Sequence, residues 1–588
     1  MSTVSGTGPG TADAPSPDDA LHEAAALADR DTPPRHGAAP DGPVLAADGT
    51  PLKRSLARAL RLQKTRALML IAPLLIFVLI SFIVPIAQML WRSVENDIVS
   101  NTLPMTVPEL AQWDASDGGL PPEPVFRAMY YDMFLAAEAK KHTRLGTRLN
   151  YEQTGISSLF RQSGRKLDDL GKDILKPLRA LDGDWAQAAP WFELMSGADG
   201  AAKDTAALEA QRDRLRRVTE SPLAGEIGFA PSSEISALLP LTAQAYTDFA
   251  IFTVLEDGKD LAKTKPWETV YPALIEDMQT ADVAGYGGPR AGMLQALRAG
   301  IAEFPPPSYS AAFADIDADW AAPQVWQTIQ THARTVTPGY FLNAVDMQLT
   351  PDGAAAQPES KQILVKLFGR TLVMSLIIMG SCILLGYPIA YLLANLPMRT
   401  ANVLLILVLL PFWTSLLVRT SAWKVMLQQQ GVINDTLVWL GLVADESRLV
   451  MINNQFGTIV AMTHILLPFM ILPMYSVMQT IPPSYVRAAK SLGATNWTTF
   501  WRVYFPQSVP GIGAGSILVF ILAIGYYITP EIVGGTKGVF ISNRIAYHIS
   551  SSLNWGLAAA LGTILLAVVL LLYWCYDKIV GIDNVKLG

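Results

Sequence analysis

The chain has 588 residues, of which 51% are hydrophobic and 16% charged, and its formal net charge is −6. This composition and a mean hydropathy of +0.28 argue against an ordinary soluble protein of this length and favour a membrane protein. The acidic surplus falls within residues 1–50 and 92–366, whereas the apolar remainder of the chain is basic overall.

Residues 1–66 are expected to form a disordered cytoplasmic tail with a basic juxtamembrane end. The first 50 residues are rich in Ala, Pro, Asp and Gly and lack hydrophobic periodicity, so they cannot bury enough surface to offset the entropy of ordering. The apolar run that begins at Ala67 is too long for the core of a signal peptide. We therefore expect the first helix to remain as a membrane anchor.

Six segments come near the length of about 20 apolar residues that a transmembrane helix requires. Isolated Pro and Gly residues interrupt them, which spanning helices tolerate when neighbouring helices satisfy the freed backbone groups. The last five form a membrane core domain over 367–580. The expected spans are 67–91, 371–395, 401–422, 456–479, 508–530 and 556–577.

Lys and Arg residues in the short flanks of the spans set the expected orientation. A basic cluster precedes the first span, so the N-terminus should stay in the cytoplasm. An even number of spans then places residues 581–588 in the cytoplasm as well, and residues 92–366 outside. The cytoplasmic flanks carry Lys53, Arg54, Arg58, Arg61, Lys64, Arg66, Arg399, Arg487, Lys490, Arg502, Lys578 and Lys586.

Residues 92–366 are expected to form a mainly helical insertion between the first and second spans. Runs at 125–139, 206–218, 233–254 and 291–301 repeat apolar residues at three- and four-residue spacing, and Pro and Gly clusters separate them. Both cysteines lie in predicted spans, so packing rather than disulfides must stabilise the insertion. Its candidate core tryptophans are Trp185, Trp191, Trp267, Trp320 and Trp326.

A polar, basic stretch between the fourth and fifth spans is expected to be a cytoplasmic docking loop over 485–506. Small residues, Ala488, Ala489 and Gly493, permit the close approach of a docking helix, and Pro506 provides a rigid exit. On composition alone, an amphipathic loop at headgroup depth is the simpler interpretation. The apolar side of the loop, expected to pack on a partner or on the chain's own helices, consists of Leu492, Trp497, Phe500 and Trp501.

The spacing in this loop resembles the E-A-A-x3-G-x9-I-x-L-P motif of the membrane subunits of binding-protein-dependent ABC importers. In that family a coupling helix on the loop inserts into a groove of the ATPase. Arg487 stands where the family has glutamate, and Ser491 where aspartate is common. Both changes remove negative charge, so the ATPase is expected to carry a compensating change. The coupling residues that the resemblance implies are Arg487, Ala488, Ala489, Gly493, Val503, Phe505 and Pro506.

Three further stretches are similar to spermidine/putrescine-type permeases of this family: GYPIAYLLANLP (386–397), LLPFWTSLLVRTSAWKVMLQQQGVIN (409–434) and YYITPEIVGGTKGVFISNRI (526–545). The likeness covers 67–91 and 363–580. It implies an all-α membrane protein with six transmembrane helices. The large, mainly helical periplasmic insertion expected between helices 1 and 2 lies outside the likeness and inherits nothing from it. The likeness also implies a multi-pass subunit of the bacterial inner membrane that imports a small solute of the polyamine or related amine class.

The resemblance implies partners as well. They are two ATPase subunits, a periplasmic solute-binding protein and a second permease subunit, for which the family type favours a different chain. ATP and Mg²⁺ are expected on the ATPase, no cofactor on this chain, and no nucleic acid in the complex. The lipid bilayer surrounds the core.

Ionisable and aromatic residues in the predicted outer halves are candidates for the solute pathway. His464 lies inside the fourth span, where its simpler interpretation is a neutral imidazole bonded to a neighbouring helix. Arg419 and Glu531 sit at outer ends of spans and are expected to pair with each other or with loop groups, or, for Glu531, to attract a cationic solute. Aromatic residues at this depth line a cation path or form an interfacial belt. They include Trp413, Tyr526 and Tyr527.

No catalytic set competes with a transport function. The chain lacks a G-x-x-x-x-G-K-[ST] sequence, and its six histidines form no metal-type pair at helical spacing, so ATP hydrolysis is expected on another polypeptide. Two alternatives stay open. A membrane-anchored periplasmic receptor would use 92–366 to bind a ligand, and an ion-coupled carrier would show buried acids and internal repeats, of which the sequence displays neither.

Overall fold

The computed structural model describes residues 52–115, 118–197 and 205–580. The expected disordered tail over 1–50 and the C-terminal residues 581–588 therefore lie outside the described residues. The chain divides into two compact units, Met1–Pro85 and Ile86–Gly588.

The first apolar helix begins earlier than the predicted span. Helix α2 (Leu52–Val78) continues through a π-helical turn, Leu79–Ile83, into α3 (Val84–Arg92), so the basic stretch ahead of the span is helical. The run Lys64–Arg92 is long and apolar enough to cross a membrane, and it contains the predicted span 67–91.

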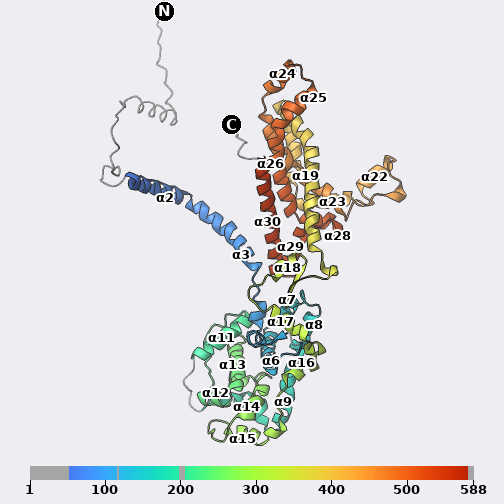
Figure 1. The fold of residues 1–588 in the computed structure, drawn as a ribbon. Helices are drawn as coiled ribbons and strands as arrows, with labels where there is room; N and C mark the ends of the chain where they lie inside the picture. Colours follow the sequence, from blue (N-terminus) through green and yellow to red (C-terminus); the bar gives the residue numbers. More distant parts are fainter. Residues whose placement is uncertain (1–51, 116–117, 198–204, 581–588) are drawn as a thin grey trace, which may run out of the picture. The chain divides into compact units, whose positions relative to one another are not determined.

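A helical body follows, as the periodicity predicts (Figure 1). Three of the predicted runs each coincide with one helix, whereas the run 233–254 divides at Leu239, where Pro240 opens a new helix. A single short hairpin, β1 (Met347–Thr350) with β2 (Gly353–Ala356), closes it. Its helices are α4 (Ile98–Thr102), α5 (Thr106–Leu110), α6 (Glu123–Glu138), α7 (His142–Leu149), α8 (Ile156–Lys166), α9 (Asp168–Leu181), α10 (Ala188–Ser196), α11 (Thr205–Thr219), α12 (Ser233–Leu238), α13 (Pro240–Leu255), α14 (Val270–Thr280), α15 (Ala291–Ala299), α16 (Tyr309–Ile316), α17 (Pro323–Thr331) and α18 (Gly339–Ala344).

Two hydrophobic clusters fill this body. One unites buried residues of 99–167 with 309–329, and the other draws mainly on 178–304. Four of the five candidate tryptophans are fully buried within these clusters, and Trp267 packs between them. The absence of disulfides from the body is thus offset by aromatic packing.

The body is joined to the apolar helices through a buried polar network. Arg148 pairs with Glu152 at 2.7 Å, and their side chains are only 7% and 5% exposed. The Arg148 guanidinium also donates to the Tyr340 hydroxyl and lies over its ring. The Tyr340 ring also lies so close to Gly556 that a Cβ at Gly556 would fall 2.4 Å from it. Gly556 is required for this close approach.

His332 makes this network sensitive to pH. Burial lowers the pKa of His332 to about 4, with Glu152 opposing this shift and Arg148 adding to it. The unfolded chain takes up a proton near pH 6.5 and the folded chain does not, so stability should fall as pH drops from 6.5 towards 4, by about 3 kcal/mol in total. Melting curves of wild type and His332→Asn across this range test the effect. The variant should lose the extra acid sensitivity, and equal curves would contradict the assignment.

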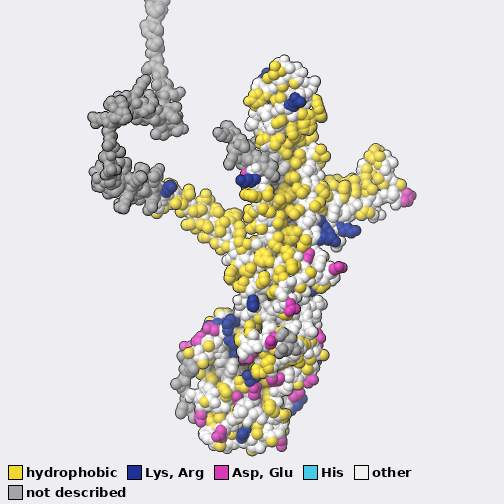
Figure 2. Space-filling model, viewed as in Figure 1, with side chains coloured by type: hydrophobic (Ala, Val, Ile, Leu, Met, Phe, Trp, Pro, Cys, Tyr) yellow, Lys and Arg dark blue, Asp and Glu magenta, His cyan; other side chains and the backbone are white. Residues whose placement is uncertain are grey.

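Among the described residues, five helices are long and apolar enough to cross a membrane, or six if a bent pair counts as one span; Lys64–Arg92 is the first, and the others follow the helical body. Figure 2 shows their surface dominated by hydrophobic side chains, in contrast to the mixed charges of the helical body. The helices from the second span onward are α19 (Leu364–Asn395), α20 (Met398–Leu409), α21 (Leu416–Met426), α22 (Val432–Trp439), α23 (Gln455–Gln479), α24 (Pro483–Ser491), α25 (Asn496–Thr499), α26 (Phe505–Gly525), α27 (Ile528–Val533), α28 (Gly535–Gly538), α29 (Ile541–Ser550) and α30 (Trp555–Val580).

Two predicted spans differ from the observed helices. The segment 401–422 is not one straight helix, because α20 and its 3-10 extension to Trp413 meet α21 at an angle of 93°. The break has a local cause, since Ser415 caps α21 by accepting a hydrogen bond from the Val418 amide. The predicted span 508–530 is too long at its end: α26 stops at Gly525, and short helices follow.

Helices α19, α23 and α26 pack as the centre of the core. Glycines permit close contact with α23: a Cβ on Gly511 would meet the Met474 backbone at 3.0 Å, and one on Gly515 would meet the Met470 sulfur at 2.7 Å. Small residues serve this purpose in membrane helices, where packing replaces the hydrophobic effect as the source of association. This bundle carries the loop between α23 and α26 at one of its ends.

Candidate functional site

The predicted docking loop is a helix–turn–helix at one end of the α19, α23 and α26 bundle (Figure 1). Helix α24 ends in a left-handed turn at Gly493, whose φ is +86°. The Ala494 amide donates to the Ala489 carbonyl, and the Gly493 amide to the Lys490 carbonyl. These bonds form the motif that ends helices at glycine. A Cβ on Gly493 would meet no atom within 4 Å, so within this chain the backbone conformation, and not close packing, requires glycine.

The apolar residues of the loop divide into two groups. Val486 and Phe500 pack against the buried cluster of the core, and Phe500 contacts the rings of Tyr387 and Tyr391. Leu492 and Trp497, by contrast, are 88% and 72% exposed. Two large apolar side chains held outward on a structured turn indicate a surface for another protein or for the membrane interface.

The exit from the loop is helical throughout. Thr495 caps α25 by accepting a hydrogen bond from the Thr498 amide. A π-helical turn, Phe500–Tyr504, then leads directly into α26. Pro506 is the second residue of α26 and cannot donate a backbone hydrogen bond to the π-helical turn that precedes it. Val503 in this turn is partly buried.

Arg487 and Ala488 lie on the exposed side of α24, and Ala489 is half-buried. Arg487 makes no ion pair with any described residue. The coupling residues that the resemblance implies are therefore split: the α24 end of the loop faces outward, while Phe505 packs on Tyr387 and Trp501. Within the motif, exposed residues of α24 are thus followed by packed residues at the start of α26.

The outer candidates lie in the turn that follows α26. Glu531 is exposed, and its carboxylate accepts a 2.6 Å hydrogen bond from the Asn543 amide, which also donates to the Tyr527 carbonyl. Ser542 donates to the Tyr526 carbonyl at 2.7 Å. Sequence reasoning missed Asn543 and Ser542, because nothing in the pattern shows that α29 folds back onto this turn.

His464 bonds to a neighbouring helix. The Trp423 indole N–H donates to His464 Nδ1 at 3.1 Å, and the two rings meet edge to face. Because an indole N–H is only a donor, Nδ1 carries no proton in this arrangement and the imidazole is neutral. The Arg419 Nε atom is buried and has no hydrogen-bond partner among the described residues.

The predicted outer residues do not form one cluster. No ion pair joins Arg419 to Glu531 within the part of the chain that the structure describes. Trp413 is exposed at the bend between α20 and α21. Among the described residues, His464 bonds to Trp423, whereas Glu531 belongs to a hydrogen-bond group with Asn543 and Tyr527.

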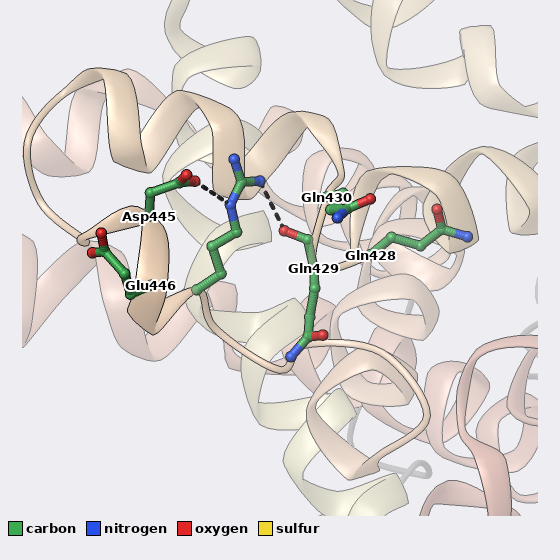
Figure 3. A pocket seen from close by; sticks show the side chains of 6 residues that line it. Gln428, Gln429, Gln430, Asp445 and Glu446 are labelled. Carbon is green, nitrogen blue, oxygen red and sulfur yellow. Dashed lines mark hydrogen bonds and ion pairs between the residues drawn. The ribbon is translucent and has the colours of Figure 1, made fainter.

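A further cleft, of about 410 Å³, lies beside α22 (Figure 3). Arg448 crosses it, donating to the Asp445 carboxylate at 2.7 Å and to the Gln429 carbonyl at 2.9 Å. None of the predicted site residues lines it. The lining residues are Gln428, Gln429, Gln430, Asp445, Glu446 and Arg448.

Comparison with known proteins decides which family has this arrangement. Residues 369–580 match the family of binding-protein-dependent transport system inner membrane components. The spermidine/putrescine transport system permease protein PotB of Escherichia coli is 36% identical over 211 residues, which is 35% of this chain and 76% of the relative. PotB of Salmonella typhimurium is 37% identical and 73% covered. The chain belongs to this family.

One more relative and one solved structure are also similar to part of this chain. The inner membrane ABC transporter permease protein YdcU of E. coli is 30% identical over 258 residues, 41% of this chain and 80% of the relative. A crystal structure of a bacterial alginate ABC transporter covers 37% of this chain and 77% of the matched chain, at 20% identity and a TM-score of 0.30. The chain is a multi-pass permease subunit of a binding-protein-dependent importer, a class that works with an ATPase and a binding protein.

Proposed function

We propose that this permease subunit imports a polyamine or a related small amine. The relatives named as spermidine/putrescine permeases support the solute class, and each matches 211 residues of this chain. The exposed Glu531 carboxylate in the outer turn offers a contact for a cationic solute. The observation that carries the importer mechanism is the outward-facing pair Leu492 and Trp497 on the loop after α23.

In this mechanism two ATPase subunits bind ATP and Mg²⁺, and each docks on a loop of the 485–506 type. A second permease chain, different from this one, completes the path, because one subunit of this kind does not enclose it. Arg487 replaces the family glutamate, so the ATPase surface that meets it should be acidic or neutral. Both termini lie in the cytoplasm, since the basic flanks follow the positive-inside rule.

Residues 92–366 then lie in the periplasm, beside the face where the binding protein delivers solute. We place the contact with the binding protein on this body. Its polar network at Arg148 and Tyr340 would transmit the docking to α30 through Gly556.

Uptake of labelled putrescine tests the solute class. In cells that lack other polyamine importers, the complete complex should take up putrescine or spermidine. Glu531→Gln should raise the half-saturating concentration about twofold to fivefold, because an exposed ion pair contributes about 0.2–1 kcal/mol. Asp445→Asn, an exposed carboxylate at the α22 cleft, is the matched control and should leave uptake unchanged. Absence of polyamine uptake by a complex whose ATPase responds to another solute would contradict the proposed class and leave the permease assignment intact.

A further inference from the structure

The helical body contains the same set of hydrogen bonds twice, in the same order along the chain. In the first set, the Asp132 carboxylate on α6 accepts bonds from the Met105 amide and from the amide and hydroxyl of Thr106. In the second, Asp277 on α14 accepts from the Leu241 amide and from the amide and hydroxyl of Thr242. The donors belong to matching segments, Leu-Pro-Met-Thr (103–106) and Leu-Pro-Leu-Thr (239–242), and the acceptor helices read VFRAMYYDM (125–133) and VYPALIEDM (270–278).

A second feature is also repeated, downstream of the first in each case. The sequences Asp-Gly-Asp-Trp (182–185) and Asp-Ala-Asp-Trp (317–320) each form a 3-10 turn that the leading aspartate caps. A second tryptophan follows at the same spacing. Its indole donates to the carbonyl of the first, at 2.9 Å from Trp191 to Trp185 and 3.0 Å from Trp326 to Trp320.

The two copies exchange their second halves. We define lobe A as the cluster of 99–167 with 309–329 and lobe B as the cluster of 178–304. In lobe A, Phe126 of the first copy packs edge-on against Trp326 of the second at 4.6 Å. In lobe B, Tyr271, the counterpart of Phe126, packs edge-on against Trp191 at 5.8 Å. Each lobe therefore combines the first half of one copy with the second half of the other.

The connection between α8 and α9 explains the exchange. Leu167 between these helices keeps helical dihedrals, φ −60° and ψ −30°, so the first copy does not fold back on itself. It continues from lobe A into lobe B, and the chain returns past the three prolines at 305–307. This is an intramolecular equivalent of domain swapping.

The seam between the lobes is filled. Trp267 contacts Phe134 of lobe A at 5.6 Å and Phe252 of lobe B at 5.3 Å. Arg127 pairs with Glu276 across the seam at 2.5 Å, and the Tyr309 hydroxyl donates to the same carboxylate at 3.0 Å. A receptor that closes on a ligand needs a seam that can open, with few contacts across it. Here aromatic, ionic and hydrogen-bonded contacts all cross it.

We infer that residues 99–331 are a tandem duplication whose copies exchange halves, and that they move as one rigid body and not as two lobes that close on a ligand. The body therefore acts as a fixed extension of the permease, held to the core where Arg148 of lobe A meets Tyr340. This inference corrects the expectation that the chain has no internal repeat. The repeat lies in the helical body, outside the apolar spans. It does not depend on the proposed solute.

Amide hydrogen exchange, measured on the full-length chain, tests whether the two copies have swapped their second halves. Trp320→Ala should accelerate exchange at least tenfold in 125–134, which belongs to the other copy, and leave 270–278 at the wild-type rate. Trp185→Ala should do the reverse. Faster hydrogen exchange in the segment that belongs to the variant's own copy, or an equal increase in both segments, would overturn the inference. If an alanine variant does not accumulate, Trp185→Phe and Trp320→Phe make the same comparison.

Spin labels on the two lobes test the rigidity. Arg161 in lobe A and Lys263 in lobe B are exposed, and the chain's cysteines, Cys382 and Cys575, can be replaced by serine. Electron–electron distance measurements on Arg161→Cys/Lys263→Cys should give one narrow distribution, unchanged by millimolar putrescine. A second population, or a shift on adding putrescine, would show that the lobes move and would overturn the rigid-body inference.

Discussion

Leu492→Asp is expected to abolish co-purification of the ATPase with this permease while the chain stays folded in the membrane. The side chain is 88% exposed, so the substitution removes no internal contact. Burial of a leucine against a partner contributes about 1.5–3 kcal/mol, and an unpaired carboxylate buried in its place adds a further cost. The ATPase should bind at least a hundredfold more weakly, as measured by pull-down from native membranes at graded ATPase concentrations.

Two matched variants separate docking from folding. Leu492→Met keeps the volume and the apolar surface, so the ATPase should still co-purify. Gly493→Asn keeps a residue that tolerates the left-handed turn, and it should preserve the loop. If Leu492→Asp binds the ATPase as wild type does, the exposed turn is not the docking surface, and contact with the lipid headgroups becomes the better interpretation.

The sequence predicted what depends on local pattern. Among the described residues, hydropathy located the helices that are long and apolar enough to cross a membrane, because a spanning helix must be apolar over its whole length. The spacing from Ala488 to Pro506 predicted a polar loop, and the structure explains its turn by the positive φ of Gly493; the docking role of the loop stays a prediction. Helical periodicity likewise predicted the helical character of the insertion.

Features that depend on contacts between residues far apart in the chain were not predicted from the sequence. The bend at Ser415 looked like the middle of a span, because Leu, Val and Trp residues continue on both sides of it. The Asn543 contact with Glu531 depends on the path of α29. The duplication was missed for a different reason: its sequence matches are short and scattered, and their significance shows only in the identical bonds that Asp132 and Asp277 accept.

Arg148→Met is expected to destabilise the helical body by about 3–5 kcal/mol. The guanidinium is buried with Glu152, and its loss leaves that carboxylate inside the protein with only the Asn343 amide as a nearby donor and His332 at 3.9 Å. Breaking one side of a buried ion pair costs this much because the remaining charge is uncompensated. Hydrogen exchange in α7 of the purified full-length chain should become about a hundredfold to a thousandfold faster.

The double variant Arg148→Met/Glu152→Gln decides whether charge or shape is responsible. It removes both charges and keeps similar volumes, so it should recover most of the lost protection. Arg144 is on the same helix as Arg148 and forms an exposed ion pair with Glu220, so Arg144→Met is the control and should change hydrogen exchange little. Equal losses in the single and double variants would mean that Arg148 acts through its packing on Tyr340, and that the charge pair contributes nothing to the joint. Because Tyr340 rests on Gly556, loss of protection in 340–344 alongside α7 would show that the network holds the body to the membrane core.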